Sequence, residues 1–193
     1  PREGIFAKVL EGGMIKVGDK IKVIYPDKDM PYQAAVITLS DKGSRGERVD
    51  TSGPKASEIL REHGFEIIEE ILLPDEMAQI KKELIRLSDS RQVDLIITTG
   101  GTGLSPRDCT PEATLAVADR NVPGIAEAIR AGSMTITKRA MLSRGVSVIR
   151  KKTLIINLPG SKKAVEEGLS FIIDQLPHGL DTLRGNTQDC GRN

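Results

Sequence analysis

The stretch Val93–Thr114, VDLIITTGGTGLSPRDCTPEAT, limits the possible folds of this chain more than any other part of it. A short apolar run, Leu95–Ile97, comes before the glycine-rich segment Gly100–Gly103, and Thr110–Glu112 is typical of a helix start, with Thr110 as the expected N-cap. A β-branched apolar run bounded by glycine predicts a buried strand. Strand, glycine loop and helix in this order place backbone N–H groups around an anion at the carboxyl end of a sheet.

The same alternation of strand and helix extends along the chain. Further strands are predicted where apolar residues cluster, at Ala34–Leu39, Glu66–Leu73, Val146–Ile149 and Thr153–Leu158, the last two as a hairpin at one side of the sheet. Helices are predicted from Thr51, from Pro74, over Ile125–Ala131, from Ser161 to Pro177 and over Leu180–Leu183. Strands that alternate with helices at this spacing predict an α/β fold with a mostly parallel sheet.

Composition excludes several classes of function. The 193 residues have a net charge of +1, which gives no argument for nucleic acid or an anionic membrane as partner. No apolar run reaches membrane-spanning length, and no signal peptide is visible. The two cysteines, Cys109 and Cys190, have no metal-ligand spacing, so we expect a protein of the reducing cytoplasm. The chain begins with Pro1, which is consistent with a fragment of a longer protein.

Four loops follow predicted parallel strands and are expected at one edge of the sheet: Ser40–Gly46, Pro74–Glu76, Gly100–Asp108 and Pro159–Ser161. Together they supply glycines and hydroxyls, which suit phosphate oxygens, and carboxylates, which suit Mg²⁺. The sequence therefore predicts a site for a nucleotide or another phosphorylated ligand with a metal. Neither the dinucleotide fingerprint nor the P-loop motif is present.

Each candidate residue also has a purely structural interpretation. Asp75, after a proline, is a natural helix N-cap, and Ser161 can be a cap and nothing more. Asp41 can bond its own loop as an Asx-turn. Asp108 has no obvious structural role, because Thr110 already supplies the cap of the next helix.

These motifs resemble the MogA/MoaB family of molybdenum-cofactor biosynthesis, which includes the G domain of gephyrin. The most specific match is TTGGTG followed by RDCTPEAT. The matching segments cover nearly all of Gln33–Gly185 in family order: Ile37–Pro54, Leu72–Glu76, Ile97–Thr114, Leu142–Val165 and Leu176–Gly185.

The resemblance implies a three-layer α/β/α fold, usually trimeric, and adenylylation of molybdopterin by ATP with Mg²⁺, giving adenylyl-molybdopterin and pyrophosphate. It implies that Asp75 and Asp108 are the catalytic pair and the metal ligands. It also implies nucleotide- and pterin-binding positions at Gly100, Gly101, Thr102, Gly103, Ser105, Asn157, Pro159, Gly160 and Ser161, and further cleft residues at Asp41, Gly46, Ser143 and Arg144. A MoeA-type molybdenum insertase is the expected protein partner.

The N-terminal segment Gly4–Ile24 predicts a short β-meander, and it resembles the closing strands of a MOSC domain. The expected organisation is residues 1–30 as the end of a MOSC-like β domain with a linker, residues 31–187 as the MogA/MoaB-like domain, and residues 188–193 as a flexible tail. Two alternatives to the adenylyltransferase remain: a non-catalytic trimeric scaffold that binds molybdopterin, and a nucleotide-dependent enzyme acting on another pterin-like substrate.

Overall fold

The computed structural model describes residues 12–14, 16–20 and 30–185. The chain divides into two units, Pro1–Met30 and Pro31–Asn193. In the first unit the residues Lys16–Asp19 form a turn, in which Asp19 N donates to Lys16 O. Most of the predicted meander with its MOSC resemblance, and the tail at residues 188–193, lie outside the described residues. All helices and strands of the described ranges belong to the second unit.

Six strands form one sheet in the described part of the chain, in the order β2-β1-β3-β6-β5-β4. The strands β2, β1, β3 and β6 are parallel, and the short strands β5 and β4 complete the sheet in antiparallel pairings. The mostly parallel sheet and the β5–β6 hairpin are therefore confirmed, although β6 lies inside the sheet. The bounds are β1 Gln33–Leu39, β2 Glu66–Leu73, β3 Leu95–Thr99, β4 Arg120–Asn121, β5 Ser147–Arg150 and β6 Thr153–Leu158.

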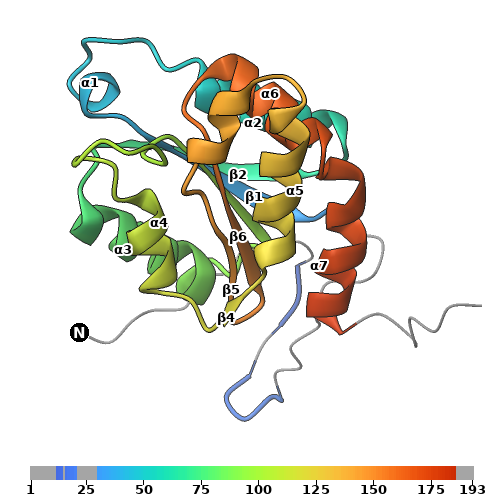
Figure 1. Ribbon diagram of the computed structural model, residues 1–193. Coiled ribbons are helices and arrows are strands. Elements are labelled where there is room, and N and C mark those ends of the chain that lie inside the picture. The colour runs from blue at the N-terminus through green and yellow to red at the C-terminus, as the bar shows by residue number, and fades with distance from the viewer. Residues whose placement is uncertain (1–11, 15, 21–29, 186–193) are drawn as a thin grey trace, which may run out of the picture. The chain divides into compact units, whose positions relative to one another are not determined.

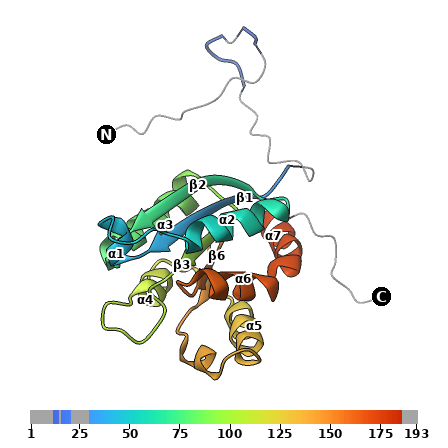
Figure 2. The ribbon, with the colours of Figure 1, turned by 90° about the horizontal axis from the view of Figure 1, so that it is seen from above.

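Helices cover both faces of this sheet (Figure 1). One face carries α2, α5, α6 and α7, and Figure 2 shows α6 between α2 and α5. The other face carries α3 and α4. The α/β/α layering is thus confirmed. The bounds are α1 Asp41–Ser44, α2 Ser52–Glu62, α3 Met77–Ile85, η1 Arg86–Ser90, α4 Thr110–Leu115, α5 Pro123–Met134, η2 Lys138–Leu142, α6 Lys162–Ser170, η3 Ile173–Gln175 and α7 Leu176–Arg184.

Two apolar cores, one on each face of the sheet, hold the layers together. Successive side chains of a strand point to opposite faces, so Val36 packs in the core beneath α2 and α6 and Ile37 packs in the core beneath α3. Because both of their faces are buried, the inner parallel strands β1, β3 and β6 are mostly apolar, which is why their positions could be predicted from the sequence.

Several predicted helix ends are wrong by a few residues. Thr110 is the first residue of α4 rather than its N-cap, and its hydroxyl donates to Gly100 O. The N-cap of α3 is Glu76 and not Asp75. Pro177 does not end a helix but lies in the first turn of α7, where a missing N–H costs nothing. Ser161 does cap α6, since its Oγ accepts from Ala164 N at 3.2 Å.

The path of the chain reverses between β1 and β3. From β1 it passes through α2 to β2 on one side, whereas from β3 it continues to β6 on the other side. The loops after β1 and β3 therefore leave the sheet in opposite directions, and this divergence opens a crevice at the carboxyl ends of the strands. In the described part of the chain no helix has the length and apolar character that a membrane span requires.

An ion pair ties the C-terminal helix to the sheet. Arg184 donates to both carboxylate oxygens of Asp94, at 2.8 and 2.7 Å, and Asp94 also accepts from Gln33 N at the start of β1. The Arg184 guanidinium stacks 4.4 Å from the ring centroid of Tyr32. Both charged groups are largely buried, so this pair is shielded from water.

Arg184→Ala is expected to lower the free energy of unfolding by about 2 kcal/mol, because it removes charge-assisted bonds and leaves Asp94 without that partner. Urea denaturation measures the change. The control is Arg61→Ala, which breaks the exposed Arg61–Glu70 pair and should cost about 0.5 kcal/mol or less. If the two variants lost the same free energy of unfolding, the anchoring role of Arg184 would be contradicted.

Candidate active site

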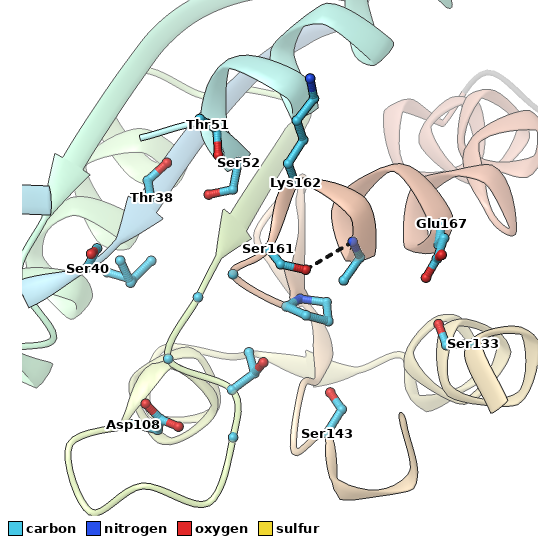
Figure 3. A pocket seen from close by; sticks show the side chains of 18 of the residues that line it. Thr38, Ser40, Thr51, Ser52, Asp108, Ser133, Ser143, Ser161, Lys162 and Glu167 are labelled. Carbon is cyan, nitrogen blue, oxygen red and sulfur yellow. Dashed lines mark hydrogen bonds between the residues drawn. The ribbon is translucent and has the colours of Figure 1, made fainter. Parts of the chain in front are cut away.

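A cleft of about 960 Å³ opens at the carboxyl ends of β1, β3 and β6, where the crevice was expected (Figure 3). The loops after these strands form one part of its wall, and residues of α5, η2 and α6 form the rest. The residues predicted from the sequence that line it are Asp75, Gly100, Gly101, Thr102, Gly103, Asp108, Ser143, Pro159, Gly160 and Ser161.

The glycine loop lies at the centre of this cleft, and its glycines are there for steric reasons. Gly100 and Gly101 have φ values of +98° and +62°, in the left-handed region that other residues adopt only with strain. A Cβ at Gly100 would collide with Leu39 O, and one at Gly101 would collide with Thr110 Oγ1. The loop after β3 is therefore pressed directly against β1 and the start of α4.

Asp75 and Asp41 connect the loops after β2 and β1 by reciprocal hydrogen bonds. Asp41 N donates to Asp75 Oδ2, and Asp75 N donates to Asp41 Oδ1, both at 3.1 Å. The second oxygen of Asp75, Oδ1, is buried and has no hydrogen-bond partner among the described residues. Burial raises the pKa of the Asp75 carboxyl, and this effect exceeds the opposing effect of the hydrogen bond from Asp41 N; the charges of Asp41 and Asp108 also raise the pKa.

Asp108 lies beside Gly103 of the glycine loop, whereas Asp75 Oδ1 lies beside Gly101. Asp108 Oδ2 accepts from Ser105 N at 3.3 Å, and a Cβ added to Gly103 would lie 2.8 Å from the same oxygen. Asp108 therefore has the structural role that the sequence did not reveal, because it closes its own loop. Its side chain nonetheless lines the cleft (Figure 3).

The two carboxylates suit a divalent cation. The buried, unpartnered oxygen of Asp75 is the kind of group that a cation would satisfy, and Asp108 adds a second negative charge beside it. Within the described ranges, no group of three or more His, Cys, Asp or Glu side chains could hold a metal. A cation here would take its other ligands from water and substrate, as Mg²⁺ commonly does.

Asp41, Gly46 and Ser105 are not among the residues that line the cleft. Asp41 is held from outside by Arg107, whose Nε and Nη2 donate to its two oxygens at 3.0 and 2.9 Å. These bonds lower the pKa of the Asp41 carboxyl. Arg107 also donates to Glu76, so it ties together the loops after β1, β2 and β3. Gly46 and Ser105 are exposed.

Asn157 and Arg144 also lie outside the cleft lining. Asn157 is buried, and its Nδ2 donates to Thr98 Oγ1 and Thr114 Oγ1 at 2.9 and 3.0 Å, while its Oδ1 accepts from Val146 N. Its side chain thus joins β3, α4 and the segment before β5. The Arg144 guanidinium instead donates to backbone carbonyls of the loop after β3.

A network of hydroxyl groups around Asp50, which was not predicted from the sequence, lines the cleft near the end of β1. Asp50 accepts from Thr38 Oγ1 at 2.6 Å and from Ser52 Oγ at 3.0 Å, and Ser52 shares a hydrogen bond with Thr99. Asp50 also accepts from the N–H groups of Ser52 and Gly53 in the first turn of α2, whose N-cap residue is Thr51. In the sequence, Thr38 and Thr99 stand at the ends of two predicted buried strands, and this position could have indicated the network.

The cleft also gathers cations from segments far apart in the chain. Arg48 comes from the loop before α2, Arg130 from α5, Arg139 from η2 and Lys162 from α6. In the sequence only Lys162 adjoins one of the four predicted loops, since it follows Pro159–Ser161, and the other three cations lie outside those loops. Combined with the carboxylate pair and the glycine loop, these cations suit a ligand that carries several phosphates.

Residues 35–178 match a family described as "Probable molybdopterin binding domain". The chain belongs to this family. The chain is also similar to individual proteins over most of its own length. The chain is 40% identical over 153 residues to a molybdopterin adenylyltransferase of Helicobacter pylori strain J99, covering 78% of this chain and 87% of that protein.

Other members of the family agree in sequence and in fold. A molybdopterin adenylyltransferase of Escherichia coli K12 is 44% identical over 142 residues, covering 72% of each protein. The crystal structure of the molybdopterin biosynthesis enzyme MoaB from Thermus thermophilus has a TM-score of 0.76 and 47% identity, covering 80% of this chain and 97% of that one.

Asp75→Asn is expected to raise the melting temperature of the metal-free protein by about 2 °C. A raised pKa means that folding disfavours the charged carboxyl, so removing the charge stabilises the folded state at neutral pH. The control is Asp89→Asn. The hydrogen bonds from Arg150 lower the pKa of the Asp89 carboxyl, so removing this charge should destabilise the folded protein. Thermal unfolding in a chelating buffer measures both, and a lower melting temperature for Asp75→Asn would contradict the site geometry.

Proposed function

We propose that this chain is a molybdopterin adenylyltransferase, which transfers the AMP moiety of ATP to the phosphate of molybdopterin with Mg²⁺ and releases pyrophosphate. The observation that carries the proposal is the placement of Asp75 and Asp108 in one cleft, beside Gly101 and Gly103 of the glycine loop, in a chain at least 40% identical to proteins named for this activity. A phosphate oxygen of molybdopterin attacks the α-phosphorus of ATP, and the bond from that phosphorus to the oxygen bridging to the β-phosphate breaks.

Both reactants are anions, so the protein must neutralise their charge and align them. Asp75 and Asp108 would hold Mg²⁺, which when bound supplies positive charge at the reacting phosphoryl oxygens. The backbone N–H groups of Gly100–Gly103 would donate to phosphate oxygens as charge develops on them. The segment Pro159–Ser161, ahead of α6, offers further donors, and the cleft arginines offer counter-charges.

Asp108→Ala is expected to lower molybdopterin-dependent pyrophosphate release by about a hundredfold or more, because it removes one of two proposed metal ligands. The assay contains purified protein, ATP, Mg²⁺ and freshly prepared molybdopterin. The control is Asp174→Asn, an exposed aspartate of η3 that is not among the cleft residues and should leave the rate unchanged.

The outcomes distinguish the enzyme from its alternatives. Release that needs molybdopterin and collapses in Asp108→Ala supports the adenylyltransferase. A folded wild-type protein that binds molybdopterin but releases no pyrophosphate would be a scaffold, and the proposal would fail. Release with a different pterin but not with molybdopterin would reassign the substrate.

We further propose that the chain forms a homotrimer in the cytoplasm and passes its product to a MoeA-type insertase. The support is the family resemblance. Light scattering on the purified protein tests the oligomeric state, and a monomer at micromolar concentration would overturn the trimer. The MOSC-like origin of residues 1–30 also stays a proposal.

A further inference from the structure

Arg144 contacts the glycine loop at several points from outside the cleft. It follows Ser143, which lines the cleft, but Arg144 itself is not a lining residue. Its N donates to Thr102 O at 2.9 Å, its Nε to Gly103 O at 2.6 Å and its Nη2 to Asp108 O at 2.7 Å. Its Nη1 is paired with Glu112 in the first turn of α4.

These contacts join the two ends of one loop. Gly103 and Asp108 bound the exposed residues Leu104–Arg107, and the planar guanidinium donates to a carbonyl on each side of them. Inside the loop, Asp108 N donates to Ser105 O at 2.9 Å. A lysine cannot copy this arrangement, because an ammonium group is a point charge without the fixed fork of donors.

The loop needs such a brace because its own sequence leaves it free to move. It begins with glycines that favour no single conformation in the unfolded chain, and its tip is exposed to water. Yet it carries Asp108, whose carboxylate must lie opposite Asp75 for the two to act on one ligand. A displacement of about 1 Å at a reacting centre can cost about a hundredfold in rate.

We propose that Arg144 is a positioning residue: it holds the loop Gly103–Asp108, and with it the Asp108 carboxylate, in the conformation that the reaction needs, without touching substrate. The proposal rests on the proposed adenylyltransferase for its kinetic consequence. Its structural consequence, an ordered loop, does not depend on that function.

The test compares Arg144→Ala, Arg144→Lys and Glu112→Gln with the wild type. Arg144→Ala should lower kcat for pyrophosphate release about a hundredfold and leave both KM values within about threefold, because ground-state binding does not involve Arg144. Amide hydrogen exchange at Asp108 should speed up by about tenfold. Added guanidinium ion should restore part of the rate. Arg144→Lys should give a kcat and an exchange rate at Asp108 that lie between those of the wild type and of Arg144→Ala.

Glu112→Gln is the matched control, since it removes the charge that pairs with Arg144 but keeps both carbonyl bonds, and it should change neither kcat nor the exchange rate. A raised KM with unchanged kcat in Arg144→Ala would make Arg144 a binding residue and overturn the proposal. Unchanged exchange at Asp108 would overturn it as well. If the wild type releases no pyrophosphate, the proposed function fails, and the exchange measurement still decides the positioning role.

Discussion

A buried carboxylate oxygen without a hydrogen-bond partner is the feature on which the rest of this site depends. Asp75 Oδ1 is in that position in the described structure, and the carboxylates of Asp41 and Asp108 lie close enough to raise the pKa of the same group. Such a cluster opposes folding unless a cation or a donor compensates for it. The fold therefore maintains a local cost in free energy at the point where a metal and a phosphate would bind.

The surrounding structure explains how that arrangement is kept in place. Parallel strands bring the loops after β1, β2 and β3 to one edge, and the reversal of the chain between β1 and β3 opens a space there. Glycines allow the loop after β3 to touch β1. Arginines outside the cleft then hold the loops: Arg107 binds Asp41, and Arg144 binds the carbonyls on either side of the exposed loop tip.

Much of the fold follows from local sequence. Strands buried on both faces are mostly apolar, so Ala34–Leu39 and Thr153–Leu158 could be predicted, and the loops after them had to share an edge. Helix ends were less predictable, because the Thr110 hydroxyl bonds the distant Gly100 instead of capping its own helix. The side-chain roles of Asn157 and Arg144 depend on contacts across more than thirty residues, which no local pattern encodes. The resemblance to the MogA/MoaB family marked both positions, and the geometry assigns their side chains to bracing the site.

The measurement that tests the proposed adenylyl transfer most directly follows the α-phosphorus of ATP. The protein is incubated with Mg²⁺, molybdopterin and ATP labelled at that atom, and the products are separated and identified by mass. We expect the label to move to the molybdopterin phosphate, with one pyrophosphate released for each labelled pterin. Label that stays in ATP, while molybdopterin binds to the folded protein, would contradict the transfer.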